Sequence, residues 1–492
     1  MSKVGNICFQ IVYDNYYSIL LFKIALSLLS DKSKLFYVCS RSSNDAIGFF
    51  TIKSLILRST FFIGLVRARF LKKLTLRLSG YKSKSLHNLF LFPIYLIYGV
   101  IYYIHINVIY KGRVAEYTIM DVKVGDLLID SFIRFRPAKR LNSRSIFVVL
   151  LLSQTAYDIK YLRRFFTSNH IKIYCSSYAS YLNHGLPVRI ALQLGIKVIT
   201  FGSLNKFANE LSPRYPFHSL NRSTVSRRED LTAKALENAR EQIESRLFRA
   251  DMRDMPYMKY MPINQVPSEI TYLDLTDAVV IFLHDFTDSY HIYDNLIYEC
   301  FWDWAIDTID CLIDSNVKFF LKPHPNQNEY SEDIFKQLDC RYKTAITVLS
   351  KDYTTSVIAN GNIRCGITVY GTVAHELAYL GVPTLIAAYG QPYIDFRFAI
   401  NFNNKNDYRS RLRSTDHIAR SYDSHIFRYD ALRYYIASDQ FASVEEKTRF
   451  LHVWQFFSMS YSSDKQLLNS ALDELDSLLN CESWNALQER IT

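Results

Sequence analysis

Gly-Ile-Thr-Val-Tyr-Gly-Thr occupies residues 366–372, and the helix-like run Val-Ala-His-Glu-Leu-Ala-Tyr-Leu-Gly follows at once over residues 373–381. An apolar, strand-like run comes next, at residues 382–388. Upstream, Lys-Pro-His-Pro-Asn at residues 322–326 closes the apolar run 317–321 in the same way. Both motifs predict a strand whose carboxyl end delivers polar groups to a crevice, which is where open α/β sheets bind nucleotides and phosphates.

The same alternation of short apolar strands and helices extends outward from these motifs through most of the chain. At 492 residues the chain is too long for one ordinary domain, and such alternation implies parallel sheets. We therefore expect an α/β protein with two Rossmann-like βα lobes, at residues 1–270 and 271–407, a cleft between them, and a helical tail at residues 408–492. In the first lobe the strands are predicted at residues 7–13, 35–39, 126–130, 171–175 and 197–201.

The net charge of +11 is concentrated in one stretch of the first lobe. Residues 46–115 contain eleven lysines and arginines and no acidic residue. Apolar residues alternate with these basic residues at helical spacing, which is more typical of a helix on an anionic bilayer than of a nucleic-acid surface. The uncharged run 90–110 has about the length of a membrane span, but its Pro93, His105 and Asn107 favour a patch on the membrane surface or core elements of the lobe. We expect an insertion at about residues 48–113 that faces an anionic membrane surface, with no nucleic-acid partner; a basic soluble surface is the alternative.

The cysteines and the N-terminus indicate the compartment. The eight cysteines are scattered, with no Cys-x-x-Cys pair and no Cys/His cluster. This pattern argues against a disulfide framework and a structural zinc site, and it favours a reducing environment. The N-terminal residues form a poor signal peptide. We therefore expect a cytoplasmic location and neither a metal nor a cofactor.

Polar residues of the 366–372 motif are candidates for binding a nucleotide phosphate. Gly371 lets the backbone approach a ligand closely, and Thr372 can cap the helix or donate to an oxygen. With Tyr370 they would form an anion site at the free N–H groups of the helix start. Glu376, about one turn into the helix, either complements the helix dipole or holds ribose hydroxyls.

The Lys-Pro-His-Pro motif supplies a second group of candidates. Two prolines fix the backbone on either side of His324. A rigid loop at a strand end suits a residue that must meet a phosphate without reorganising, so we expect Lys322 and His324 to bind the donor and His324 to act in catalysis. The first strand of the second lobe runs into His284 and Asp285, which are further candidates for donor contact. Their spacing matches no usual metal-ligand pattern.

The first lobe should supply the acceptor site and any general base. Asp130 ends the strand predicted at residues 126–130, which makes it the first candidate for the base; a helix cap is the alternative. Tyr181, His184 and Arg189 lie between the next predicted strand and the middle of the following helix, and they are candidates for acceptor binding. Arg189 can pair with an acidic sugar or a lipid phosphate, or it is only a surface charge.

Three motifs together resemble a known family. Lys-Pro-His-Pro (322–325), Thr-Val-Tyr-Gly-Thr (368–372) and Leu-Gly-Val-Pro-Thr (380–384) look like those of the capsule polysaccharide synthesis family of bacterial GT-B glycosyltransferases, which includes β-Kdo transferases that use CMP-Kdo. The His-Pro element is also similar to that of bacterial sialyl- and polysialyltransferases. The resemblance covers roughly residues 278–393. It implies that His324 binds the donor phosphate and that the Tyr-Gly-Thr segment cradles it.

By this resemblance the chain would move a sugar from a nucleotide donor, CMP-Kdo or another CMP-linked acidic sugar, onto a growing or lipid-linked glycan of the capsule or O-antigen kind. Asp-x-Asp, the usual metal site of the other main glycosyltransferase architecture, occurs nowhere in the sequence, which favours a metal-independent mechanism. The enzyme would work peripherally on the inner face of the cytoplasmic membrane. The alternatives are a UDP- or GDP-sugar-dependent glycosyltransferase, a nucleotide-sugar epimerase of the same fold and a non-enzymatic scaffold.

Overall fold

The computed structural model contains two compact units, each built around one large β-sheet. Unit 1 comprises Met1–Arg136, Leu141–His218 and Gln440–Thr492, and unit 2 comprises Pro137–Arg140 and Ser219–Asp439. Within these units the structure describes residues 5–10, 15–28, 34–39, 79–82, 92–110, 114–136, 138–203, 206–219, 231–248, 273–325, 327–350, 353–418, 423–438, 444–459 and 465–491.

The sheet of unit 1 has the strand order β3-β2-β1-β6-β7-β8. Neighbouring strands are parallel, except that β7 and β8 are antiparallel. The chain proceeds from β1 to β2 and β3 on one side and through β6 to β8 on the other, so the topological switch point of this Rossmann-like unit lies between β1 and β6. The strands are β1 (Asn6–Gln10), β2 (Leu35–Cys39), β3 (Ser79–Lys82), β6 (Ile171–Ser176), β7 (Lys197–Ser203) and β8 (Lys206–Leu211).

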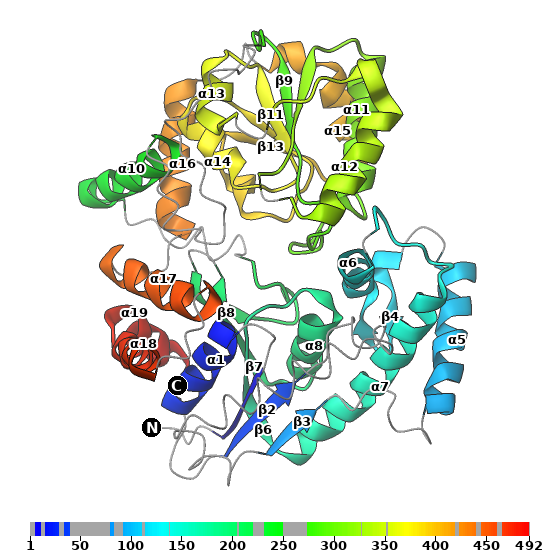
Figure 1. Ribbon diagram of the computed structural model, residues 1–492, viewed down its shortest axis with the longest axis vertical. Coiled ribbons are helices and arrows are strands. Elements are labelled where there is room, and N and C mark those ends of the chain that lie inside the picture. Colours follow the sequence, from blue (N-terminus) through cyan, green and yellow to red (C-terminus); the bar gives the residue numbers. More distant parts are fainter. Residues whose placement is uncertain are drawn as a thin grey trace. The chain divides into compact units, whose positions relative to one another are not determined.

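Helices cover both faces of this sheet (Figure 1). On one face, Ile7 and Phe201 of the sheet share a hydrophobic core with Leu475 and Trp484, so the C-terminal helices belong to unit 1. The helices are α1 (Asn15–Ser27), α17 (Val444–Met459), α18 (Lys465–Leu478) and α19 (Glu482–Ile491) on that face, and α7 (Ile146–Ser168) and α8 (Leu186–Gln193) on the other, with α5 (Phe92–Val108) against α7. A short hairpin, β4 (Thr118–Ile119) and β5 (Val122–Lys123), precedes α6 (Gly125–Phe135).

Unit 2 has a fully parallel sheet in the order β10-β9-β11-β12-β13. Its switch point lies between β9 and β11, and its core includes Val280, Phe320 and Leu377. Helices α11, α12 and α15 lie on one side of the sheet and α13, α14 and α16 on the other (Figure 1). The elements are α10 (Ala233–Phe248), β9 (Val279–Phe282), α11 (Phe301–Asp314), β10 (Phe319–Lys322), α12 (Glu329–Tyr342), α13 (Thr355–Asn360), β11 (Cys365–Thr368), α14 (Val373–Tyr379), β12 (Thr384–Ile386), β13 (Ala399–Asn401), α15 (Lys405–Arg413) and α16 (Ser424–Ser438).

The predicted fold class, two Rossmann-like βα lobes with helices at the C-terminal end, is confirmed. The boundaries differ from those predicted at residues 270 and 407. Helices α10 and α16 pack against each other and belong to unit 2, whereas residues after 440 return to unit 1. A contiguous chain segment was expected for each lobe, but helices from the C-terminal end of the sequence pack into the hydrophobic core of unit 1.

The strand predicted at residues 126–130 is wrong, because these residues lie in helix α6. Every residue from Gly125 to Ile133 is buried. The helical period is present in the sequence, because Asp126, Asp130 and Arg134 recur at four-residue intervals. Residues 126–130 alone are too short to show it, and such a short apolar stretch looks like a buried strand.

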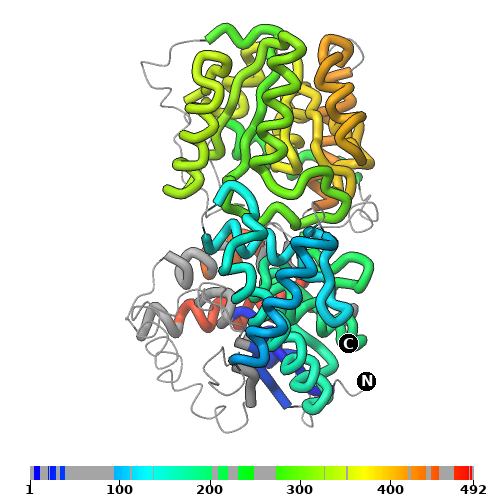
Figure 2. Tube along the Cα trace, turned by 90° about the vertical axis from the view of Figure 1, so that its right-hand side faces the viewer, coloured from blue at the N-terminus to red at the C-terminus, as the bar shows by residue number. Residues whose placement is uncertain are grey.

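The predicted insertion is described only in part. Strand β3 joins the edge of the sheet of unit 1. Helix α5 packs alongside α7, as Figure 2 shows. The rest of residues 48–113 lies outside the described residues. Among the helices of the described part, none has both the length and the apolar character required to cross a membrane.

Candidate functional site

The carboxyl edge of the sheet of unit 2 gathers side chains from the ends of three neighbouring strands. His284 follows β9, and Thr368 is the last residue of β11; these are the two strands at the switch point. The Nε2 atom of His284 lies 2.9 Å from Oγ1 of Thr368. Lys322 and His324 follow on the other side of β9, at the end of β10. Open α/β sheets bind their ligands at such an edge.

His284 is held among aromatic rings. Its imidazole stacks on Phe301 at 4.4 Å, and the rings of Tyr370 and Trp304 lie 5.0 and 6.0 Å away. Burial, with a smaller effect of the nearby His324, lowers the pKa of His284 to about 3. The ring is therefore neutral at pH 7, and the structure brings two histidines together that the sequence proposed separately.

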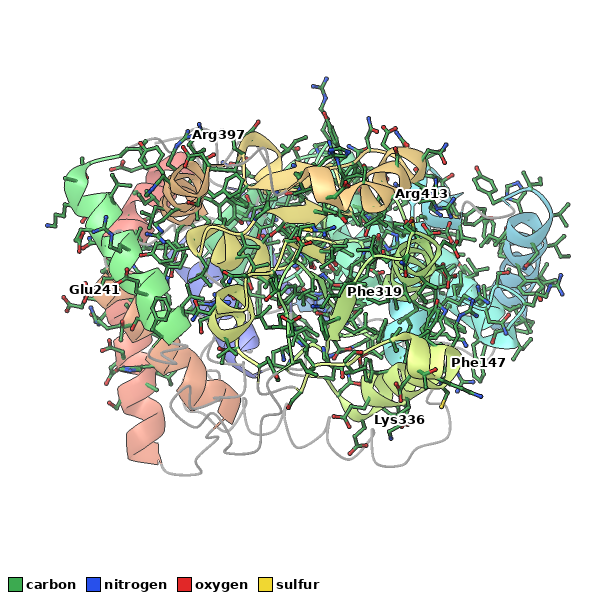
Figure 3. The ribbon with its side chains drawn as sticks, turned by 90° about the horizontal axis from the view of Figure 1, so that it is seen from above. Phe147, Glu241, Phe319, Lys336, Arg397 and Arg413 are labelled. Atoms are coloured by element: carbon green, nitrogen blue, oxygen red, sulfur yellow. The ribbon has the colours of Figure 1, made fainter. Side chains whose placement is uncertain are left out.

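His324 lies on the loop that links β10 to α12. Burial lowers its pKa; Asp285 and Asp288 oppose this effect and Lys322 adds to it. The ammonium of Lys322 is buried and donates to the carbonyl of Ser350 at 3.3 Å. Figure 3 labels Phe319 at the start of β10 and Lys336 on α12, the two elements that bracket this loop.

Asp285 ties the loop after β9 to the start of α12. Its Oδ1 accepts hydrogen bonds from the backbone N–H and the hydroxyl of Thr287, at 2.8 and 2.7 Å. Its Oδ2 accepts from Nδ2 of Asn328 at 3.2 Å, and Asn328 caps α12 by accepting from the N–H of Ser331. Asp285 therefore fixes the far end of the His324 loop; its predicted contact with the donor stays a prediction.

The Tyr370–Thr372 segment, which follows β11, borders the site near His284. The hydroxyl of Tyr370 lies 2.9 Å from the carbonyls of both Ser289 and Tyr290, which share its single hydrogen. A Cβ on Gly371 would lie 3.2 Å from Oγ1 of Thr368 and 3.6 Å from Cε1 of His284, so glycine keeps this approach to the histidine open. Thr372 precedes α14, but its side chain does not cap the helix.

Glu376 forms a buried ion pair instead of facing solvent. Its Oε1 lies 2.6 Å from NH2 of Arg246 on α10, and its Oε2 accepts from Oγ1 of Thr355 at 2.9 Å. The same guanidinium nitrogen donates to Oγ1 of Thr372 at 3.1 Å. Neither expected role of Glu376 included this partner, because α10 was assigned to the other lobe.

Sequence reasoning missed Gln327, which lies in the same loop as His324. Its side chain is only 6% exposed, yet neither its Nε2 nor its Oε1 has a hydrogen-bond partner among the described residues. Burying an amide without partners is costly, so such a group calls for an explanation. In the sequence, the signal that could have pointed to Gln327 was its position two residues after Pro325, in the loop that carries His324.

In unit 1 the structure packs α6, which carries Asp130, against the segment that carries the other predicted residues. Asp130 is buried in α6, so the strand end that suggested a catalytic base does not exist. Arg189 is also buried and forms a bidentate ion pair with Asp126, at 2.6 and 2.5 Å. Tyr181 has a positive φ of 58° and packs against Phe135. His184 alone approaches the switch point.

Among the described residues no group of three His, Cys, Asp or Glu side chains is placed to hold a metal ion.

No protein-family model and no curated protein matches this sequence. Solved structures show only remote similarity. A UDP-GlcNAc 2-epimerase of Methanocaldococcus jannaschii, in complex with UDP-GlcNAc and UDP, aligns with 85% of this chain and 93% of its own at 9% identity and a TM-score of 0.29.

Two further structures are similar at the same level. A glycosyltransferase of Rickettsia africae aligns over 94% of this chain and 100% of its own, at 9% identity and a TM-score of 0.29. MnaA of S. aureus, solved with UDP, aligns over 89% and 94%, at 9% identity and a TM-score of 0.30. These values are too low to transfer an activity to this chain. The assignment of two Rossmann-like units rests on the strand orders given above.

Proposed function

We propose that this chain is a glycosyltransferase that binds a nucleotide-sugar donor at the carboxyl edge of the sheet of unit 2. The observation that carries the proposal is the meeting of His284 and Thr368 across the switch point, beside the Lys322–His324 loop. An ammonium, two imidazoles and a hydroxyl supply hydrogen-bond donors to phosphate oxygens. The loop that carries His324 is fixed at its far end by Asp285, which suits a group that stabilises a leaving phosphate without moving.

The finer assignment follows the motif resemblance. We infer a CMP-linked acidic sugar such as CMP-Kdo as the donor and a growing or lipid-linked bacterial surface polysaccharide as the acceptor. Unit 2 would hold the donor, unit 1 would hold the acceptor, and no metal ion would be needed. His324 would donate a hydrogen bond to the departing nucleotide phosphate.

Thermal unfolding with CMP, UDP and GDP, on the wild type and on His324→Ala, tests this proposal. A nucleotide that binds only the folded chain raises the midpoint by mass action. We expect CMP to stabilise the wild type and the response to be lost in His324→Ala but kept in His425→Ala, a matched change at an exposed histidine of the same unit. A response to UDP or GDP alone would overturn the CMP assignment, and no response to any nucleotide would overturn the donor site.

We further propose that unit 1 docks peripherally on an anionic membrane through α5. Five aliphatic side chains on this helix are at least half exposed, and they recur at intervals of three and four residues, which places them on one face. They are Ile94, Ile97, Ile101, Ile104 and Val108.

The opposite face of α5 packs on α7. Tyr95 and Ile106 are buried there, and a Cβ on Gly99 would collide with the carbonyl of Val149. The helix itself carries no Lys, Arg, Asp or Glu, while the chain on either side of it is basic, with Lys82 and Lys84 before it and Lys111 and Arg113 after it. An apolar face flanked by positive charge fits the interface of an anionic bilayer.

Co-sedimentation with vesicles tests this location. We expect the protein to bind vesicles that contain phosphatidylglycerol, less so at high salt, and not vesicles of phosphatidylcholine alone. The triple variant Ile97→Gln/Ile101→Gln/Ile104→Gln should lose this binding, and Leu194→Gln, an exposed apolar residue outside α5, should keep it. Equal sedimentation of the triple variant and the wild type would overturn the proposal.

A further inference from the structure

The switch point of unit 1 also carries a set of buried polar side chains. Gln10 is the last residue of β1 and Ser176 the last residue of β6, the two strands on either side of this point. Both side chains are 1% exposed or less, and the hydroxyl of Ser176 lies 2.7 Å from Oε1 of Gln10. The edge at which open α/β sheets bind ligands is therefore polar in this unit too.

The orientation of the Gln10 amide is fixed by its surroundings. Its Nε2 lies 3.0 Å from the backbone carbonyl of Asn183, which can only accept a hydrogen bond. The NH₂ group must therefore face Asn183, and Oε1 must face Ser176 and His184. The distance from Oε1 to Nδ1 of His184 is 3.0 Å.

This contact determines the tautomer of His184. An amide oxygen only accepts, so Nδ1 of His184 must carry the hydrogen. Burial lowers the pKa of His184 to about 4, so the ring is neutral at pH 7 and holds a single N–H. Its Nε2 is then a hydrogen-bond acceptor, and no described residue donates to it. The ring is partly exposed, so a ligand can reach it.

Two further groups of unit 1 bear on the kind of ligand that this site would take. The hydroxyl of Ser177, which follows β6 and is 1% exposed, has no hydrogen-bond partner among the described residues. Arg189, which sequence analysis offered for an anionic group, is neutralised by Asp126. A phosphate or carboxylate needs hydrogen-bond donors or positive charge, and His184 offers an acceptor instead.

We propose that the switch point of unit 1 binds the hydroxyl groups of an uncharged sugar or polyol, with Nε2 of His184 accepting a hydrogen bond from a ligand hydroxyl and Ser177 making a second contact. This inference deepens the proposed transferase function and rests on it for the role of the ligand, which would be the neutral terminal residue of the acceptor glycan. Gln10 acts as a positioning residue, because it holds His184 in the tautomer that can accept.

Histidine-selective ¹⁵N spectra of the full chain test the tautomer and the ligand class together. We expect His184 to be protonated on Nδ1 only, and its Nε2 resonance to shift on titration with methyl glucoside, methyl galactoside or glycerol but not with inorganic phosphate. Protonation on Nε2, a response to phosphate instead of the neutral compounds, or no response to any of them would overturn the proposal.

Variants separate binding from folding. His184→Gln keeps an acceptor near the position of Nε2 and should retain glycoside binding, whereas His184→Phe should weaken it about tenfold, the loss expected for one hydrogen bond. Gln10→Met, which leaves the histidine in place, should weaken it as well, and His452→Phe, at an exposed histidine of α17, should not. Equal affinity of His184→Phe and the wild type would contradict the proposal.

Titrations with glycosides and with nucleotides test the sugar site of unit 1 and the donor site of unit 2 separately. Stabilisation by CMP that persists in His184→Phe, while the glycoside response is lost, supports both sites. Glycoside binding without any nucleotide response in the wild type would remove the transferase function and leave the sugar site standing. Nucleotide binding without a glycoside response would remove the sugar site of unit 1 and leave the donor site of unit 2 standing.

Discussion

Arg246 and Glu376 form an ion pair at 2.6 Å, and their side chains are only 5% and 9% exposed. The partners come from α10 and α14, two helices that the sequence assigned to different lobes. Both charges have lost most of their hydration, so each is tolerated mainly because of the other. The pair therefore gives Glu376 a structural role, independent of any contact with a ligand.

We predict that Arg246→Met lowers the free energy of unfolding by about 3–5 kcal/mol, because it leaves the carboxylate buried without its partner. The double variant Arg246→Met/Glu376→Met should recover a large part of this loss, since it removes both charges. Urea unfolding measures both effects, with Arg240→Met on the exposed face of α10 as the control, for which we expect a change within about 0.5 kcal/mol. A double variant less stable than Arg246→Met would contradict the prediction.

The inner strands of the two sheets were predictable from sequence because buried parallel strands are short apolar runs between helices. The edge strands β3, β8 and β13 were not predicted. The Lys322–Pro325 and 366–372 motifs were placed correctly at strand ends for the same reason. Helix α6 was mistaken for a strand because residues 126–130 alone are too short an apolar stretch to show the helical period.

The partners of the candidate residues could not be predicted. His184 meets Gln10 across 174 residues of sequence, and Arg189 meets Asp126 across 63. Such pairs depend on strand order and helix packing, which local patterns do not encode. Gln327 was missed because its feature of interest, a buried amide without partners, exists only in the folded chain.

We predict opposite effects on stability and binding for Gln327→Met. Methionine has a similar volume and no amide, so replacing a buried, unpartnered amide should leave the free energy of unfolding unchanged or raise it. If Gln327 binds the donor, nucleotide affinity should fall about tenfold, the cost of one hydrogen bond.

Urea unfolding and calorimetric titration with the nucleotide that stabilises the wild type measure these two quantities. The exposed Gln337→Met in α12 is the control for handling and oxidation. Nucleotide affinity that is unchanged in Gln327→Met would remove this residue from the donor site.

We predict that the protein loses stability as the pH falls below about 6.5, the ordinary pKa of histidine. Burial lowers the pKa of His284 and His375 to about 3 and that of His184 to about 4. Below pH 6.5 the unfolded chain therefore binds more protons than the folded chain. The stabilisation present above pH 6.5 is lost progressively as the pH falls toward these pKa values. Each histidine steepens the dependence by at most about 1.4 kcal/mol per pH unit.

Unfolding curves between pH 7.5 and about pH 4.5 would show this slope, above the range in which most carboxylates titrate. His375→Phe should make the slope shallower, because it removes one of the histidines whose pKa burial lowers, whereas the exposed His425→Phe should leave it unchanged. A slope that is the same in His375→Phe and the wild type would show that His375 does not resist protonation.

We predict that Arg189 stabilises unit 1 and does not bind the acceptor. Its guanidinium donates two hydrogen bonds to Asp126, and a third to the carbonyl of Lys123 at 2.6 Å, all within a buried site. Arg189→Met should lower the free energy of unfolding by about 3–5 kcal/mol. Arg189→Lys should restore little of it, because an ammonium cannot reproduce the planar fork that fits both carboxylate oxygens.

Chemical unfolding of both variants tests this role, with the exposed Arg214→Met as the control. The double variant Arg189→Met/Asp126→Leu should be more stable than Arg189→Met, since the orphaned carboxylate is gone. The affinity for methyl glycosides, measured well below the unfolding midpoint, should be unchanged in Arg189→Lys, because the hydroxyl ligand is assigned to His184. An Arg189→Lys variant that unfolds like the wild type but binds the glycoside more weakly would place Arg189 in the binding site after all.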